Sequence, residues 1–131
     1  MRPILLDTNI VIYILKGDAT IIAMLENLGN VSFSISIITW IEVLSGSFRQ
    51  NKNISELAQD MEIFKRLPLD ETIGVKAAHF IQKRIKMGNK RNFNDAIIAA
   101  TACNLNVPLI TNNPKGFRQF KELKIISPNK V

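Results

Sequence analysis

The sequence predicts an α/β protein, built as a three-layer α/β/α sandwich around a mainly parallel sheet. First, short apolar runs alternate with helical patterns along the chain, which is typical of parallel strands joined by helices. Second, 131 residues with 47% hydrophobic content suffice for one domain, residues 1–131, with a substantial core. Third, the apolar run 4–6 passes through Asp7 into a second apolar run, 10–15, which indicates a strand that turns sharply into a helix.

The elements of the first half follow from apolar spacing and from the residues that end helices. We expect a buried strand at 4–6, helices at 10–15 and 19–28, a strand at 31–36 and a helix at 37–44. Each helix ends close to a glycine, namely Gly17, Gly29 or Gly46. The strand at 31–36 alternates polar and apolar side chains. Ser36 or Thr39 is expected to cap the helix that follows it.

The second half continues the alternation. We expect helices at 54–67, 70–87, 96–105 and 117–123, a very short strand at Leu69, and strands at 107–111 and 124–127. Pro68 is expected to end the first of these helices, because proline cannot donate a backbone hydrogen bond. Pro108 indicates the very beginning of the next strand.

Charge and cysteine content narrow the class of protein. Lys and Arg number 17 against 11 Asp and Glu, so the net charge of +6 favours a polyanionic partner, either nucleic acid or an acidic protein. A soluble basic protein without such a partner would have the same charge. Cys103 is the single cysteine, which excludes an internal disulfide and fits a reducing, cytoplasmic compartment. No signal peptide and no membrane-spanning segment is expected from the apolar runs.

Three acidic residues stand where burial is expected, whereas most others fit polar helix faces. Asp7 follows a buried strand, Glu42 lies within an apolar helix, and Asp95 directly precedes the apolar run 96–100. Because burying an unpaired carboxylate is costly, one cation bound by all three would explain the pattern. Carboxylate oxygens suit Mg²⁺ or Mn²⁺, and one histidine with one cysteine gives no reason to expect zinc.

Asp7 has a second interpretation. An aspartate between a strand and a helix can cap that helix, which stabilises a protein by about 0.5–2 kcal/mol. The same position at the carboxyl end of a strand is where open α/β sheets bind ligands. Both interpretations remain open from the residues alone.

Four motifs in this order resemble those of the PIN-domain nucleases, and among them the VapC-type toxins of toxin–antitoxin pairs. The motifs occupy residues 6–9, 36–46, 94–100 and 109–113, and the resemblance covers essentially the whole chain. It implies a small α/β/α sandwich and a metal-dependent endoribonuclease that uses Mg²⁺ or Mn²⁺ and leaves a 5′-phosphate and a 3′-hydroxyl.

The resemblance also implies roles for individual residues and partners. Asp7, Glu42 and Asp95 match the acidic positions that hold the metal and carry catalysis. Polar support around them would come from Thr8, Asn9, Thr39, Thr111 and Asn113. Proteins of this type bind an RNA substrate, form homodimers and are held inactive by a cognate antitoxin protein.

One position departs from the family pattern. Many relatives carry a further acidic residue after the last motif, at the positions that correspond to Asn113 or Gly116. Neither residue can be an anionic ligand. We therefore expect a site of three carboxylates with one well-occupied metal ion and a low intrinsic metal affinity.

A basic cluster precedes Asp95. It comprises Lys83, Arg84, Lys86, Lys90 and Arg91, of which the four other than Arg84 are our first candidates for RNA binding. The cluster either forms a rim that binds phosphate or is a solvated helix end, where cations are favoured by the helix dipole in any case.

Three other functions compete with a ribonuclease toxin. A PIN nuclease of RNA processing would share the same site, and short length favours the toxin over it. A PIN scaffold that binds RNA or protein without catalysis would suit the missing fourth carboxylate but not the three that are present. A phospho-acceptor receiver domain would need paired acidic residues after its first strand, where this chain has Leu5 and Leu6.

Overall fold

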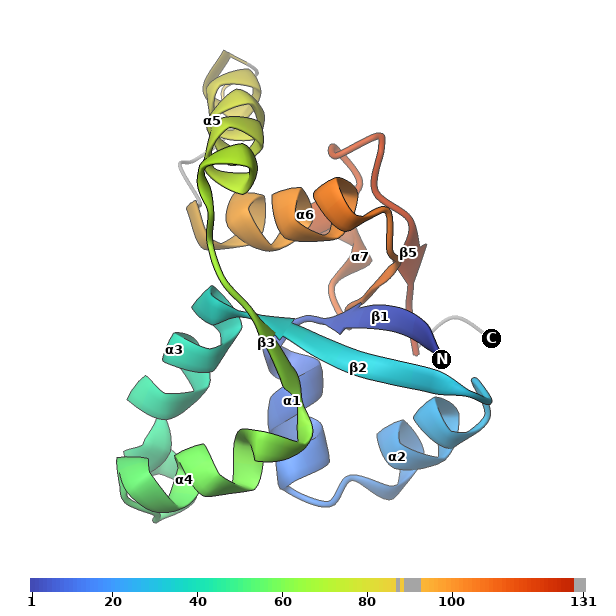
Figure 1. The fold of residues 1–131 in the computed structure, drawn as a ribbon, viewed down its shortest axis with the longest axis vertical. Coiled ribbons are helices and arrows are strands. Elements are labelled where there is room, and N and C mark those ends of the chain that lie inside the picture. The colour runs from blue at the N-terminus through green and yellow to red at the C-terminus, as the bar shows by residue number, and fades with distance from the viewer. Residues whose placement is uncertain (87, 89–92, 129–131) are drawn as a thin grey trace.

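A sheet of five parallel strands forms the middle layer of the molecule. The computed structural model describes residues 1–86, 88 and 93–128 (Figure 1). The strands are β1 (Arg2–Leu6), β2 (Val31–Ser36), β3 (Lys65–Leu67), β4 (Leu109–Ile110) and β5 (Ile125–Ile126). Their order across the sheet is β3-β2-β1-β4-β5, and every neighbouring pair is parallel. The predicted parallel sheet is confirmed.

Helices cover both faces of this sheet, as expected (Figure 1). One layer holds α1 (Thr8–Leu15), α2 (Ala19–Glu26), α3 (Ile37–Ser45) and α4 (Ile54–Asp60), with the short 3₁₀ turns η1 (Ser47–Gln50) and η2 (Met61–Ile63). The other layer holds α5 (Glu71–Lys86), α6 (Phe93–Leu105) and α7 (Pro114–Phe117). In this second layer α6 packs on the sheet, and α5 packs on α6 through Ile73 and Ala77.

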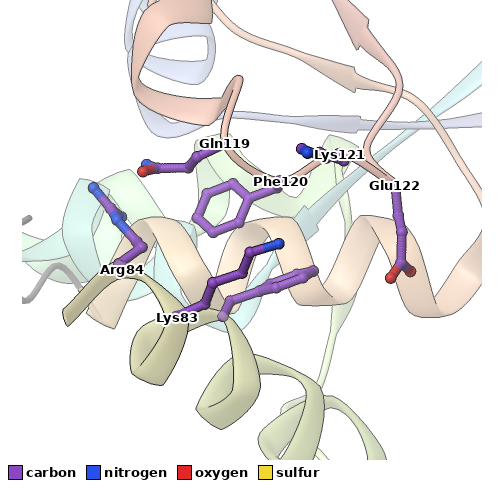
Figure 2. Close-up of a pocket in the computed structure, with 7 residues that line it drawn as sticks. Lys83, Arg84, Gln119, Phe120, Lys121 and Glu122 are labelled. Carbon is purple, nitrogen blue, oxygen red and sulfur yellow. The ribbon is translucent and has the colours of Figure 1, made fainter. Parts of the chain in front are cut away.

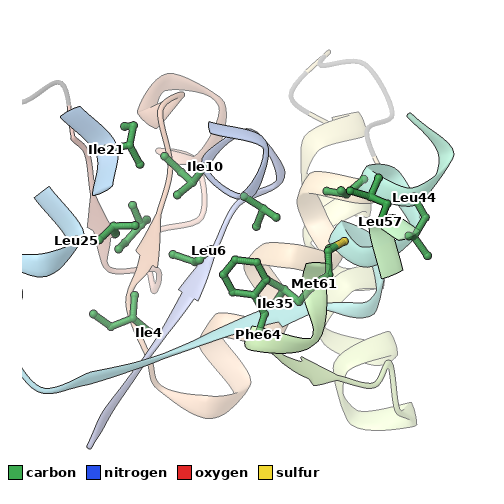
Figure 3. Close-up of a cluster of buried hydrophobic side chains, with 13 residues drawn as sticks. Ile4, Leu6, Ile10, Ile21, Leu25, Ile35, Leu44, Leu57, Met61 and Phe64 are labelled. Atoms are coloured by element: carbon green, nitrogen blue, oxygen red, sulfur yellow. The ribbon is translucent and has the colours of Figure 1, made fainter. Parts of the chain in front are cut away.

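The core divides between the two faces because successive side chains of a strand point in opposite directions. Ile4 and Leu6 belong to the cluster under α1 to α4, shown in Figure 3 with Ile35, Met61 and Phe64 around them. Leu5, between them, belongs to the cluster under α6 and α7. Ile4, Leu5 and Leu6 of β1 are all fully buried, so the central strand joins both halves of the core.

The central strand is also where the order of the sheet reverses. From β1 the chain builds outward through β2 to β3, and then returns to add β4 and β5 on the other side of β1. In open α/β sheets such a reversal leaves a crevice at the carboxyl ends of the strands. Asp7, the residue after β1, lies at this point.

The predicted helix at 54–67 is wrong in its second half. Helix α4 ends at Asp60, Phe64 is extended with φ −100° and ψ 137°, and the following residues form β3. There Lys65, Arg66 and Leu67 pair with the edge of β2. The apolar spacing was genuine, since Leu57, Met61 and Phe64 are buried, but pairing of the exposed edge of β2 outweighs the helical pattern.

Two further predictions at the ends of elements are wrong. The chain has no strand at Leu69, because the strand precedes Pro68, not follows it. The helix expected at 117–123 is instead the four-residue α7, which ends at Phe117. Phe120 and Leu123 are buried beyond the end of α7 without being helical, because hydrophobic packing on α6 needs no helix there. Strands β4 and β5 lie inside the predicted runs but are shorter.

Within the described ranges, no single helix is long and apolar enough to cross a membrane. Helices α1 and α2 reach that length and composition only as a pair bent by 110°.

Candidate active site

Asp7 is held at the carboxyl end of β1 by partners from two elements. Its Oδ1 accepts a hydrogen bond of 2.8 Å from the Thr8 backbone, at the start of α1. Its Oδ2 accepts one of 2.7 Å from Thr111 Oγ1, in the residue after β4. Asp7 is 7% exposed and Thr111 is fully buried. Asp7 therefore caps α1, and it also lies in the crevice between β1 and β4.

Glu42 reaches the same region from α3. Its Oε1 lies 2.6 Å from Thr8 Oγ1, which also lies 3.1 Å from Thr39 Oγ1. A hydroxyl has one proton, and a carboxylate can only accept. Thr8 therefore donates to Glu42 and accepts from Thr39. The two threonine hydroxyls form a hydrogen-bonded chain that orients the Glu42 carboxylate.

Asp95 comes from the first turn of α6, and its neighbour Asn94 joins it to the group. Asn94 Nδ2 donates a hydrogen bond of 3.2 Å to Glu42 Oε2. The two oxygens of Glu42 thus have separate donors, one from α1 and one from α6. The sequence placed Asn94 in a motif but assigned it no role, because nothing local connects it to a residue 52 positions earlier.

The pKa values show that the three carboxylates are electrostatic neighbours. Burial raises the pKa of Asp7 above its ordinary value of 3.8, the hydrogen bonds from Thr111 and Thr8 oppose this, and the charge of Glu42 adds to it. Burial, followed by the charge of Asp7, raises the pKa of Asp95 to about 6. The nearby Arg84 guanidinium partly offsets this rise. A cation bound near Asp7 and Asp95 would favour the charged forms of both carboxyl groups and so oppose these rises in pKa.

The oxygen atoms at the site are of a kind that suits a hard divalent ion, but the side chains are not arranged to coordinate one directly. Carboxylate and hydroxyl oxygens are the ligands that Mg²⁺ and Mn²⁺ prefer. In this conformation, however, no three acidic, histidine or cysteine side chains of the described residues are grouped closely enough to coordinate one ion. An ion held by Asp7, Glu42 and Asp95 would therefore need bound waters or a change in side-chain rotamer, and Mg²⁺ usually keeps several waters.

The remaining predicted polar residues are Asn9, Asn113 and Thr39. Asn9 lies beside Glu42 in a hollow of about 320 Å³ that Tyr13 and Lys16 also line. Asn113 donates through its backbone to Thr111 Oγ1 at 3.0 Å. Thr39 is fully buried in the hydroxyl chain already described.

The side chain of Asn113 lies against Gly116. A Cβ built at Gly116 would be 2.6 Å from Asn113 Nδ2, so the glycine makes room for the amide. An acidic side chain at position 116 would displace Asn113. Asn113 and Gly116, the two positions at which this chain lacks a further acidic residue, are thus packed against each other.

Of the predicted basic residues, Lys83 and Lys86 lie in the last turn of α5. Both are exposed. Lys90 and Arg91 lie outside the described residues.

The sequence of this chain matches a known protein family. A sequence model of the PIN domain matches residues 4–123. This range begins in β1 and contains Asp7, Glu42 and Asp95. The chain belongs to the PIN domain family.

Relatives within this family are similar over nearly their whole length. Ribonuclease VapC1 of Haemophilus influenzae (strain R2866) is 32% identical over 126 residues, which cover 92% of this chain and 93% of the relative. The structure of VapBC-1 from nontypeable Haemophilus influenzae aligns with a TM-score of 0.81 at 30% identity, covering 98% of this chain and 99% of the other. A toxin–antitoxin complex from Klebsiella pneumoniae aligns with a TM-score of 0.76 at 28% identity, covering 97% and 98%.

Proposed function

We propose that this protein is a metal-dependent endoribonuclease of the VapC type and the toxin of a toxin–antitoxin pair. The observation that carries the proposal is that Asp7, Glu42 and Asp95, in a PIN domain whose strand order reverses at Asp7, lie near enough for their charges to interact. The relative at 32% identity is named a ribonuclease and aligns over nearly the full length of both chains.

Asp7, Glu42 and Asp95 would hold Mg²⁺ or Mn²⁺, partly through water. When bound, such an ion lowers the pKa of a coordinated water and stabilises negative charge on a phosphate. The protein's own contribution is to fix the carboxylates. Thr111 and the Thr8 backbone orient Asp7, while Thr8 and Asn94 orient Glu42. Since these donors come from separate elements, the fold would restrain Asp7 and Glu42 before substrate binds.

RNA is the proposed substrate because its backbone carries the phosphates that such a site attacks and the net charge of +6 attracts them. Lys83 and Lys86 at the end of α5 would contribute to that attraction, as would Lys90 and Arg91. Asn9 would contact RNA in the hollow beside Glu42.

The proposed protein partners are a cognate antitoxin and a second copy of this chain. Support for the antitoxin comes from solved relatives that are themselves VapBC or toxin–antitoxin complexes. Support for a homodimer comes from family resemblance, together with exposed apolar side chains such as Ile41 and Phe93. The cytoplasm is the proposed compartment, in keeping with the single free cysteine.

The proposal is tested by incubating a mixed RNA pool with purified protein, in Mg²⁺ or Mn²⁺ and in EDTA. The variants are Asp7→Asn and, as a matched control, Asp18→Asn. Asp18 caps α2 by accepting from the Ile21 backbone at 3.0 Å, as Asp7 caps α1. Asparagine can cap both helices, so only the loss of a site carboxylate distinguishes the variants.

We expect cleavage that requires metal, is lost in Asp7→Asn by at least about 100-fold, and persists in Asp18→Asn. Cleavage by Asp7→Asn at the wild-type rate would contradict the site. A folded wild-type protein that binds RNA but cleaves none, even when the pool is total cellular RNA, would favour the binding module instead.

A further inference from the structure

Arg84 lies in a small pocket between α5 and the segment that follows α7. Figure 2 shows Arg84 and Lys83 on α5 facing Gln119, Phe120 and Lys121. The pocket has a volume of about 60 Å³, which holds a few waters or one group of similar size. It lies outside the three carboxylates, and nothing in the proposed mechanism uses it.

Two nitrogens of the Arg84 guanidinium are buried, although Arg84 as a whole is only partly buried. Its Nε and Nη1 each expose less than 1 Å², and neither has a hydrogen-bond partner among the residues that the structure describes. Its Cζ lies 5.5 Å from the centre of the Phe120 ring, so the aromatic face holds the charged group in place. Arginine at a solvated helix end would instead direct its nitrogens into water. A buried N–H without an acceptor is costly, so an anion that enters the pocket and meets these nitrogens after a shift of the side chain would be bound favourably.

The charge of the pocket favours an anion. Lys83, Arg84 and Lys121 line it, and Glu122 is the one acidic residue among the described lining residues. Glu122 is already paired with Lys76, at 2.5 Å between Nζ and Oε2. The three cations are therefore not neutralised from within the lining.

The position of the pocket connects it to the carboxylates. Arg84 lies in the last turn of α5 and Asp95 in the first turn of α6, and these two helices pack against each other. An anion on Arg84 would thus lie next to the site without occupying it. An RNA chain bound across the site would bring to this position the phosphate next to the cleaved one along its sugar–phosphate backbone.

We propose that the Arg84 pocket binds one backbone phosphate of the RNA, adjacent to the cleaved bond, and so positions the substrate. The inference rests on the proposed function, because it assumes an RNA substrate. Arg84 is a positioning residue, since it reaches the phosphate beside the reacting one. Its planar fork suits a phosphate better than a lysine would, and the stacked ring preorganises that fork.

The test measures RNA binding without cleavage. A short fluorescein-labelled RNA of mixed sequence is titrated in EDTA across a range of salt concentrations, with wild type, Arg84→Met, Arg84→Lys and Arg2→Met. Arg2 is an exposed arginine at the amino end of β1, whereas the site lies at the carboxyl end, and its loss changes net charge equally. Thermal unfolding of each variant is recorded in the same buffer.

We expect Arg84→Met to weaken binding about tenfold and to reduce the slope of log affinity against log salt by about 0.7, the value for one phosphate contact on a single strand. Its unfolding midpoint is expected to be unchanged or higher, because an unpaired buried charge has been replaced by an apolar chain. Arg84→Lys should keep the slope but bind more weakly than wild type. Arg2→Met should match wild type.

A structural role for Arg84 predicts the opposite pattern, a lower unfolding midpoint with an unchanged salt slope, and this would overturn the inference. An equal loss of slope in Arg2→Met would overturn it too, because the effect would then be net charge alone. Inorganic phosphate that competes at the same phosphate concentration as RNA would assign the pocket to the free ion. No RNA binding by wild type would refute the proposed function itself.

Discussion

Asp7 combines two roles that looked like alternatives. One carboxylate oxygen accepts from the first residue of α1, and the other accepts from Thr111 across the crevice. A cap needs only one oxygen, which leaves the second to face the adjacent strand end. The position that makes Asp7 a cap is therefore also the position that brings it to the site.

The raised pKa of Asp95 predicts that the free energy of unfolding depends on pH. In the folded protein this carboxyl keeps its proton up to a pH of about 6, whereas its ordinary pKa is 3.8. Between these values the folded state holds a proton that the unfolded state has lost. The free energy of unfolding of the metal-free protein should therefore fall as pH rises from about 4 to about 6, and Asp7 contributes in the same direction.

Asp95→Asn should remove part of this dependence and raise the stability of the metal-free protein near neutral pH. Urea denaturation in EDTA at a series of pH values measures it. A variant profile parallel to that of wild type would show that Asp95 ionises normally.

At the scale of single elements, the caps decide where the site helices begin. Ser36 ends β2, is almost fully buried, and accepts from the Ile38 backbone at 3.1 Å to start α3. Helix α3 carries both Thr39 and Glu42, so its start sets their direction. Asn53 starts α4 in the same way, through a capping box with Glu56, but α4 carries no site residue.

Ser36→Ala and Asn53→Ala form a matched pair of cap removals. Each should lower the free energy of unfolding by about 0.5–2 kcal/mol, because the helix loses the side-chain oxygen that accepts a hydrogen bond from a backbone N–H of its first turn. Only Ser36→Ala should also weaken Mn²⁺ binding, since only α3 holds Glu42. Denaturation and Mn²⁺ titration of both variants measure this, and equal Mn²⁺ affinities would show that the cap does not position the site.

At the scale of the whole molecule, the three carboxylates come from the end of β1, from α3 and from α6, which lie in different layers. An ion bound by all three would link both helical layers through the sheet. Binding to the folded state alone stabilises it by about 2.7 kcal/mol when the ligand is at 100 times its Kd.

Mn²⁺ should therefore raise the unfolding temperature of wild type, and calorimetry should count one bound ion per chain. Glu42→Gln should lose most of the thermal shift. Glu26→Gln, which alters an exposed carboxylate on α2, should retain it. Two tight ions in wild type would contradict the three-carboxylate site, in which Asn113 and Gly116 replace a further acid.

The sequence by itself determined the local features: the starts of α1 and α3, the alternation of strands and helices, and the three acidic positions. These depend on apolar period, caps and helix-ending residues, all of which act over a few neighbouring positions. Tertiary structure alone decided that 65–67 is a strand, because only the free edge of β2 supplies its partner. It likewise decided that Asn94 meets Glu42 and that Arg84 is buried on Phe120. Such contacts join residues far apart in the chain, and they exist only once the order of the sheet has brought their elements together.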